Sequence, residues 1–555
     1  MPAHALPESK APSGAFAFFR ARGRLSTWRI FTFTLCVLVA IPLLVVASSV
    51  LHPDRETWQH LVDNVLPELV RHTLYLTLGV SVAAGALGTG LAWLTTVCEF
   101  PGRRFFSWSL MLPLALPAYV TGFVLVGLLD FTGPLATSLR QWFGPEVRLP
   151  PIRSGGGAAL ALTLALYPYV YLLARHAFLS QGKRALEVGQ SLGLSRRQGF
   201  LRIALPMARP WIAGGVVLVA METLADFGTV AVFNYDTFTT GIYKAWYSLF
   251  SLPAAAQLAS LLILFVFVVL LLEQRLRTRM RYTPAGRSSE RERLVLTGFG
   301  RLAATFFCGA VLTVAFLVPV GQLLWWALGV AAQDLDARYW AYLGRSLLLA
   351  GMAATLIAAT ALGLAYARRQ QPGAFTDAMV RFATLGYALP GAVLAIGIYL
   401  PIAWFDRLYI ALMGELFGRE AGPLLAGTLL AMLSAYLVRF LAVAHEPLAA
   451  ALQRITPSMD EAGRSLGLTS RQLLTRVHLP LLKGGVVTAM ILVFVDVMKE
   501  MPITLMTRPF GWDTLATRIF EMTSEGEWER AALPAVALLV AGLVPVILLT
   551  RQTER

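Results

Sequence analysis

The sequence predicts an all-α membrane protein with about 12 transmembrane helices in two homologous six-helix halves. Three features support this fold class: the composition, the spacing of long apolar stretches, and a polar segment that occurs twice. Hydrophobic residues make up 57% of the 555 residues and charged residues only 14%, whereas an ordinary soluble domain has about 25% charged residues. Such a chain belongs in a lipid bilayer.

Twelve apolar stretches are long enough to cross about 30 Å of hydrocarbon as helices. The second six repeat the first six at an offset of about 274 residues, so the duplication covers whole halves. The stretches lie near residues 30–50, 73–96, 108–129, 157–174, 211–233, 254–272, 303–328, 346–367, 380–403, 423–438, 484–506 and 531–550.

Basic residues orient these stretches. With both termini inside, most of the 47 Lys and Arg residues fall on the cytoplasmic side, as the positive-inside rule requires. The net charge of +15 therefore reports topology, and nucleic-acid binding is not expected. The chain then has five parts: a cytoplasmic N-terminal tail (1–29), a first transmembrane domain (30–273), a basic cytoplasmic linker (274–299), a second transmembrane domain (300–550) and a cytoplasmic tail (551–555). We expect the linker to be solvated, with anionic membrane lipid as a secondary contact.

A polar segment occurs once in each half, between the fourth and fifth stretches and again between the tenth and eleventh. The copies read EVGQSLGLSRRQGFLRIALP (187–206) and EAGRSLGLTSRQLLTRVHLP (461–480), and they share 11 of 20 positions. The spacing predicts two short helices joined by a turn at glycine, with Leu-Pro ending the segment before the next span. The paired residues are Glu187 with Glu461, Gly193 with Gly467, and Pro206 with Pro480.

Both segments resemble the EAA motif of permease subunits in bacterial ATP-binding cassette importers. The first copy departs from the name-giving letters, reading Leu186-Glu187-Val188, and the second, Asp460-Glu461-Ala462, is closer. In that family the motif forms a coupling helix that docks on the ATPase, and Gly193 and Gly467 match its signature glycine. The resemblance therefore implies a separate ATPase homodimer that contacts both segments at the six paired residues given above.

The chain itself lacks a phosphate-binding loop. Gly182-Lys183 is followed by Arg184 and is not preceded by the glycine pattern of G-x4-G-K-[ST]. We therefore expect a permease without enzymatic activity of its own. No cofactor is expected on this chain, with ATP and Mg²⁺ bound by the partner ATPase.

The fused six-plus-six arrangement most resembles the ferric iron importers. The tracts that carry this resemblance are Glu222–Thr229, Met498–Pro502, Arg508–Phe510 and Asp513–Arg518. It implies a bacterial inner membrane protein with both termini in the cytoplasm, an extracytoplasmic binding protein as partner, and ferric ion as cargo. A fused thiamine permease is the nearest alternative with a different cargo.

Two pairs of acids lie within the fifth and eleventh stretches. Glu222 and Asp226 are four residues apart, on one face of a predicted helix, and Asp496 and Glu500 are their counterparts in the second half. Each carboxylate costs about 2.5–3.5 kcal/mol in the bilayer centre on insertion scales. We interpret the four acids as lining a translocation path with transient contacts to a metal cargo, because ferric ion favours carboxylate oxygens. The alternative is structural, and Lys499 could simply neutralise Asp496.

Two prolines, Pro117 and Pro390, lie at matching places in the third and ninth stretches. A proline frees a backbone carbonyl and kinks a helix, so each is interpreted either as a packing bend or as part of a gate.

Other classes of protein fit the sequence less well. A secondary transporter of the major facilitator type also has twelve spans, but the loops after spans two and eight read Pro101-Gly102-Arg103-Arg104 and Arg368-Arg369, without its acidic and glycine pattern. An intramembrane enzyme would need a motif such as H-E-x-x-H or G-x-S-x-G, which the chain lacks. The three cysteines and seven histidines show no spacing typical of a disulfide or zinc site.

Overall fold

The computed structural model describes residues 27–51, 55–181, 191, 193–278 and 293–554. Within these ranges twelve helical segments are long and apolar enough to cross a membrane, which confirms the predicted all-α membrane fold. They are Thr27–Leu51, Leu66–Val97, Ala118–Phe143, Gly155–Ser180, Phe200–Ala225, Leu252–Leu272, Gly298–Asp334, Ala337–Gln370, Gly391–Phe417, Leu429–Gln453, Leu474–Lys499 and Trp528–Pro545.

Long helices form these spans, and short ones connect them. The long helices are α1 (Thr27–Ser48), α3 (Leu66–Val97), α5 (Ala118–Leu129), α7 (Gly155–Gln181), α10 (Leu205–Ala225) and α13 (Leu252–Thr278) in the first half, and α14 (Gly298–Leu312), α15 (Val318–Asp334), α16 (Ala337–Gln370), α18 (Gly391–Phe417), α19 (Leu429–Gln453), α22 (Leu479–Lys499) and α25 (Trp528–Glu554) in the second. The short helices are α2 (Arg55–Asn64), α4 (Arg103–Ser109), α6 (Pro134–Phe143), α9 (Arg196–Gly199), α11 (Gly228–Val232), α12 (Phe238–Tyr247), α17 (Ala374–Ala383), α20 (Pro457–Ser465), α21 (Ser470–Leu473), α23 (Pro502–Thr507) and α24 (Leu515–Ser524). Short 3-10 turns are η2 (Ser49–Leu51), η3 (Leu112–Ala115) and η6 (Thr384–Ala388), and π turns are η4 (Phe200–Ala204), η5 (Thr313–Leu317) and η7 (Leu474–His478).

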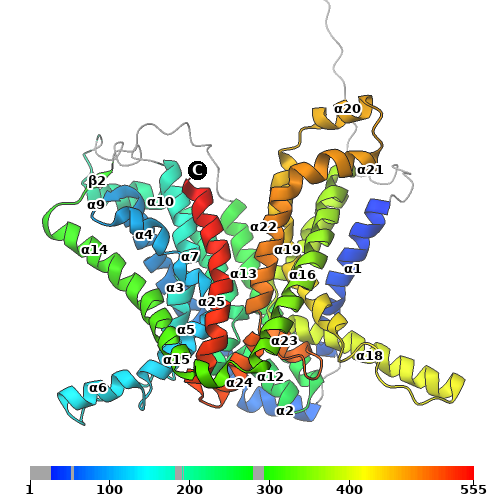
Figure 1. Ribbon diagram of the computed structural model, residues 1–555, viewed down its shortest axis with the longest axis horizontal. Coiled ribbons are helices and arrows are strands. Elements are labelled where there is room, and N and C mark those ends of the chain that lie inside the picture. Colours follow the sequence, from blue (N-terminus) through cyan, green and yellow to red (C-terminus); the bar gives the residue numbers. More distant parts are fainter. Residues whose placement is uncertain (1–26, 52–54, 182–190, 192, 279–292, 555) are drawn as a thin grey trace, which may run out of the picture.

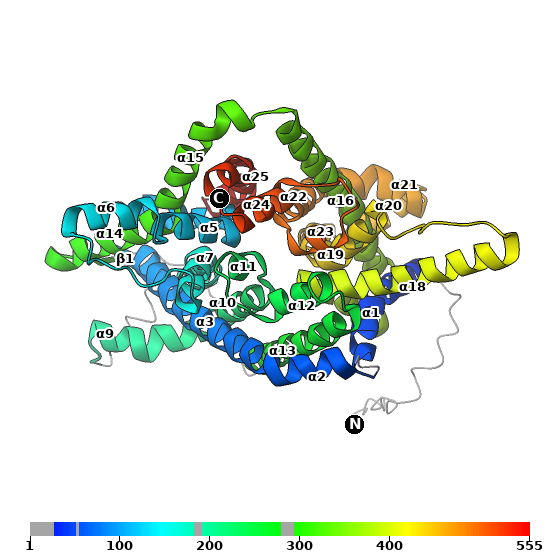
Figure 2. The same cartoon turned by 90° about the horizontal axis from the view of Figure 1, so that it is seen from below.

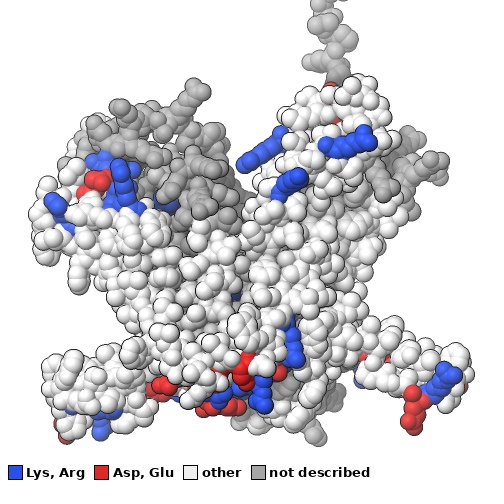
Figure 3. Space-filling view, viewed as in Figure 1, with Lys and Arg blue, Asp and Glu red and all other residues white. Residues whose placement is uncertain are grey.

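The helices form two lobes that join at one end and separate at the other (Figure 1). In one lobe α3 packs against α7 and α10, and in the other α16 packs against α19 and α22. The space-filling view shows the surface hollowed between the lobes on the side that carries α20 and α21 (Figure 3). The C-terminal end of α25 lies on that same side (Figure 1).

The first helix of the chain leaves its own half. Helix α1 packs against α16, α17 and α18 of the second half. The thiol of Cys36 donates a hydrogen bond to the carbonyl oxygen of Met379 at 3.1 Å. A Cβ on Gly397 would lie 2.7 Å from the Cβ of Pro42, so glycine allows this close crossing. The lobes are therefore not identical with the halves of the sequence.

The two halves also meet next to the linker. Strands β1 (Cys98–Glu99) and β2 (Leu294–Val295) form a two-residue parallel pair, a small addition to the all-α prediction. The carboxylate of Glu99 binds Arg103 at 3.0 Å and Arg293 at 3.4 Å. Helix α13 continues to Thr278, five residues beyond the boundary predicted at residue 273.

A glycine contact between α3 and α7 gives a first prediction. A Cβ on Gly88 would lie 2.8 Å from the oxygen of Tyr167 and 2.9 Å from the nitrogen of Tyr171, whereas a Cβ on Gly90 would have nothing within 4 Å. We expect Gly88→Ala to lower the unfolding temperature, since overpacking costs about 1–3 kcal/mol. Gly90→Ala should preserve or raise it, because alanine favours helix by up to about 1 kcal/mol. Equal unfolding temperatures for the two purified variants in detergent would contradict this packing.

A second prediction concerns orientation. Reporters fused after Arg281 or at the C-terminus should report the cytoplasm, and one inserted near Asp334 should report the outside, because basic residues are retained inside. Alkaline phosphatase and fluorescent-protein fusions measure this directly. Reversed results at all three positions would invert the topology and remove the repeated segments from the cytoplasm.

Candidate functional site

The fifth and eleventh spans end in the interior of the protein, at one acid of each pair. Helix α10 ends at Ala225, and Asp226 is extended, with ψ 129°. Helix α22 ends at Lys499, and Glu500 is extended, with ψ 122°. The second acid of each predicted pair is therefore the residue that ends the helix, whereas the predicted spans continue beyond it.

Asp226 and Glu500 each accept hydrogen bonds from the short helix that follows. Asp226 accepts from the hydroxyl of Thr229 at 2.8 Å and the N–H of Val230 at 3.1 Å. Glu500 accepts from the N–H groups of Ile503 at 3.1 Å and Thr504 at 3.2 Å. The first N–H groups of a helix have no partner within it, so these acids satisfy donors at the starts of α11 and α23.

The two prolines mark breaks of the same kind in the third and ninth spans. Pro117 directly precedes α5, with φ −58° and ψ 143°, and Pro390 directly precedes α18, with φ −57° and ψ 142°. Each proline therefore starts a helix, where we had predicted a kink within one. A proline fits this position because its missing N–H would have no partner there.

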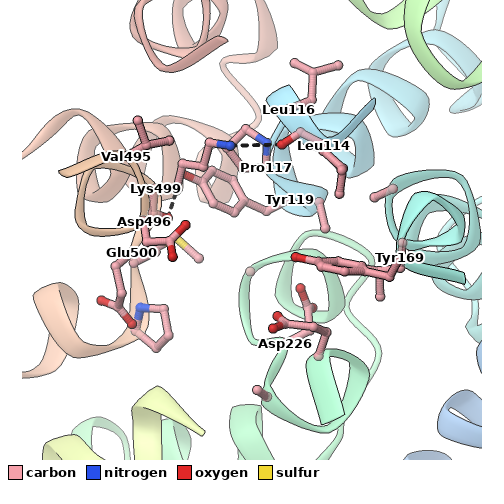
Figure 4. Close-up of a pocket in the computed structure, with 18 of the residues that line it drawn as sticks. Leu114, Leu116, Pro117, Tyr119, Tyr169, Asp226, Val495, Asp496, Lys499 and Glu500 are labelled. Carbon is pink, nitrogen blue, oxygen red and sulfur yellow. Dashed lines mark hydrogen bonds between the residues drawn. The ribbon is translucent and has the colours of Figure 1, made fainter. Parts of the chain in front are cut away.

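Three of these breaks, at Pro117, Asp226 and Glu500, line one cavity of about 390 Å³. The fourth, at Pro390, lies beside it, because the following Gly391 is next to Glu500. All four predicted acids line the cavity, together with Pro117, basic residues and tyrosines. Figure 4 shows Tyr169 and Asp226 facing Asp496, Lys499 and Glu500 across the cavity. The hydroxyl of Tyr387, from the second half, donates to Glu222 of the first half at 3.2 Å.

Two basic residues lie among the acids. The ammonium of Lys499 donates a hydrogen bond to the carbonyl oxygen of Leu114 at 3.0 Å. Lys499 therefore connects the two halves, and neutralising Asp496 is not its sole role. Arg439 donates to the carbonyl oxygen of Leu389 at 3.3 Å. A Cβ on Gly391 would meet both Glu500, at 2.7 Å, and Arg439, at 3.0 Å, which places both side chains next to this glycine.

Sequence reasoning missed Arg439. The predicted tenth stretch stopped at residue 438, although α19 continues to Gln453. The signal was the apolar run Phe440–Ala444 that follows the arginine. Arg439 is therefore a second base, besides Lys499, in a helix that lines the cavity.

The cavity does not form a closed metal cage. Among the described residues, no group of three or more His, Cys, Asp or Glu side chains is arranged to hold a metal ion. The four acids instead lie around the walls, an arrangement that allows passing contacts.

The repeated segments lie away from this cavity, on the open side of the molecule (Figure 1). In the second copy α20 leads to a turn at Gly467, with φ +79°, and then to α21. In the first copy Gly193 has φ +78°, while Glu187 lies outside the described residues. A Cβ on either glycine would have nothing within 4 Å, so backbone conformation requires glycine there.

The Leu-Pro pairs do not end these segments as predicted. In the second copy α21, η7 and α22 form one continuous helix, and Pro480 lies in the first turn of α22. The N–H of Leu479 bonds to the oxygen of Leu474, five residues back. Pro206 follows η4 in the same way, and Leu205 bonds to Phe200. A π turn widens the helix just where proline removes a donor.

Helix α20 is anchored to the spans through Asp460. Its carboxylate accepts from Arg369 at 2.8 Å and from the buried His478 at 2.8 Å. Partial burial opposes the charge, but the hydrogen bonds from Arg369 and His478 outweigh it, and the pKa of Asp460 falls below its ordinary value. At the offset of 274 residues the first half has Leu186, Thr95 and Ala204, which cannot make this cluster.

Two sets of membrane helices around a polar central cavity, with a matching loop from each set on one side, define a membrane permease. The chain belongs to the family of binding-protein-dependent transport system inner membrane components, which matches residues 84–282 and 359–555. The two matches confirm the fused, two-half permease of an ATP-binding cassette importer and its place in the inner membrane.

Individual relatives are named for different cargos. The Fe(3+)-transport system permease protein FbpB 2 of Haemophilus influenzae is 28% identical over 493 residues, 88% of this chain and 90% of that protein. The ferric transport system permease protein FbpB of Actinobacillus pleuropneumoniae is 23% identical over 547 residues, which are 94% of this chain and 76% of that protein. The molybdenum transport system permease protein ModB of Escherichia coli is 31% identical over 206 residues, which are 36% of this chain and 88% of that protein.

The Asp460 cluster gives a third prediction. Asp460→Asn should lower the unfolding temperature, because a hydrogen bond to a charged group contributes about 1.5–3 kcal/mol. The pKa of Asp460 is lowered in the folded protein. Its contribution to the free energy of unfolding is therefore fully present above the ordinary carboxyl pKa of about 3.9, and it is lost as the pH falls through the lowered pKa.

The matched control is the neighbouring Glu461, which is exposed. Glu461→Gln should leave the unfolding temperature unchanged and weaken copurification of the ATPase. Identical melting curves for wild type and Asp460→Asn across the neutral range would rule out the anchoring role.

Proposed function

We propose that this permease forms the translocation path for ferric iron, delivered by an extracytoplasmic binding protein and coupled to a separate ATPase homodimer that carries ATP and Mg²⁺. The observation that carries the proposal is that four carboxylates, two from each half, line one cavity between the lobes. Carboxylates inside a membrane are costly, and they mark ion pathways in many transporters.

The donor atoms of the cavity suit a hard cation. Carboxylates and the phenols of Tyr119, Tyr169 and Tyr387 present oxygen to it, and hard metal ions prefer oxygen ligands. The cavity is lined by four acidic residues and by two basic ones, Arg439 and Lys499. This excess of acidic residues disfavours an anion such as sulfate. Relatives that align with most of this chain, including the two described above, are named for ferric transport, which supports the same cargo.

Coupling to the ATPase would use the two repeated segments. On α20 Glu461 is exposed, and Leu466 at its end is 82% exposed, which offers a partner both a charge and an apolar contact. The lobes diverge on this side (Figure 3), which supports an inward-facing state. ATP-driven approach of the ATPase subunits would draw the segments together and open the outer side, and hydrolysis would reset the permease.

The cargo is tested by reconstitution. Liposomes containing the permease and its ATPase are given candidate binding proteins loaded with ferric ion or with thiamine, and ATP hydrolysis and uptake are measured. We expect only the ferric-loaded protein to stimulate both. Stimulation by the thiamine-loaded protein alone would replace iron by thiamine while retaining the importer class.

The acids give a fourth prediction, which distinguishes a path from a structural role. Glu222→Gln should reduce iron uptake per inserted transporter with little loss of stability, since Glu222 accepts a hydrogen bond from the hydroxyl of Tyr387 and a glutamine oxygen can accept the same bond. Asp226→Ala should also lower stability by about 1 kcal/mol, because it removes acceptors for the start of α11.

Asp226→Asn is the control, because asparagine can replace the acceptor and lacks the charge. Unchanged iron uptake in Glu222→Gln combined with Asp226→Asn would remove the acidic path. If Asp496 and Lys499 are instead a structural pair, Lys499→Met should restore the folded yield of Asp496→Asn.

A further inference from the structure

Two helices project sideways from the bundle near its outer end. Helix α6 follows α5, and the second part of α18, residues 402–417, follows the equivalent span of the other half. Figures 1 and 2 show them extending in opposite directions, away from the lobes.

The length of α18 requires part of it to leave the bundle. It begins at Gly391, beside Glu500 of the cavity, and its 27 residues extend about 40 Å at 1.5 Å per residue. The whole hydrocarbon layer is about 30 Å thick, so a helix that starts well inside it is longer than the distance left to the near surface. Its far part leaves the bundle sideways (Figure 1). Its residues are buried as far as Ile398, and the part beyond is mostly exposed.

The projecting part of α18 is nevertheless well ordered. Asp406 is only 3% exposed, and it accepts the N–H groups of Leu424, Leu425 and Ala426 at 2.6–3.2 Å. The carboxylate thus fixes the returning chain along the helix, which makes the projection a defined element.

Both helices expose an apolar stripe. On α6 the stripe contains Leu135 and the strongly exposed Trp142 and Phe143, at 78% and 70%. Thr137, Arg140 and Gln141 occupy the other face.

On α18 an exposed stripe runs one turn after another at positions i, i+3, i+7 and i+11. Its members are Phe405, Leu408, Leu412 and Leu416. Arg407 and Gly414 lie on a different face. Figure 3 shows charged side chains at the lower edge or tip of each projection, with uncharged surface on the edge toward the spans.

We propose that α6 and residues 402–417 of α18 lie along the outer interface of the lipid bilayer, with the apolar stripes among the acyl chains and the polar faces among the headgroups. On each helix an exposed apolar stripe lies opposite polar side chains such as Gln141 and Arg407, and interfacial helices have this division of side chains. Aromatic residues such as Trp142 and Trp404 favour this depth. The pair would hold the outer side of both lobes at a fixed level in the membrane. This assignment does not depend on the cargo.

Spin labels on opposite faces test the proposal. The native Cys36, Cys98 and Cys308 are all buried, so introduced surface cysteines can be labelled selectively. Phe143→Cys and Leu412→Cys place a nitroxide on the two apolar stripes, and Gln141→Cys and Arg407→Cys are matched controls on the polar faces of the same helices. Leu135→Cys and Leu408→Cys repeat the measurement if one variant is poorly produced.

The full-length permease in phosphatidylcholine nanodiscs is examined by electron paramagnetic resonance with oxygen and a water-soluble nickel chelate. We expect the labels on the apolar stripes to be more accessible to oxygen and the controls more accessible to nickel. Equal access of nickel to all four positions would overturn the proposal. Protection of residues 143 and 412 from nickel only after binding protein is added would assign these faces to that protein instead.

Discussion

The central constraint on this permease is that every backbone polar group within the hydrocarbon needs a partner. Four spans are interrupted around one cavity, and each interruption frees N–H groups that lipid cannot satisfy. Asp226 and Glu500 accept hydrogen bonds from the free N–H groups at the starts of α11 and α23. Pro117 and Pro390 stand at the starts of two other helices, where the N–H group of any other residue would have no partner in the helix. The cavity thus lies where the helices break, and three of the side chains that permit the breaks, Pro117, Asp226 and Glu500, also line it.

This arrangement gives the acids different roles. Asp226 and Glu500 are needed by the fold itself, whereas Glu222 contacts Tyr387 of the other half. Lys499 likewise reaches across to Leu114. Groups that line the cavity therefore also join the two halves, so any movement of one half relative to the other alters contacts inside the cavity.

The sequence predicts the number of spans, the duplication and the turn at Gly467, because hydropathy, repetition and glycine are local signals. It does not predict the crossing of α1 onto the second half, which depends on packing between residues more than 300 positions apart, such as Cys36 and Met379. The helix ends at Ala225 and Lys499 were missed because the apolar character continues past them. Gly228 and Pro502, just beyond, were the available signs.

The linker that makes one chain of two halves has a further consequence. In a symmetric pair of identical subunits every substitution appears on both sides, so the charge of a central cavity changes only in even steps. Here Arg439 and Lys499 each occur once, and their counterparts at an offset of 274 residues are Ala165 and Ala225. The same holds for the Asp460 cluster, whose three residues have Leu186, Thr95 and Ala204 as counterparts. Covalent fusion therefore lets evolution adjust the cavity one charge at a time and lets the two repeated segments diverge.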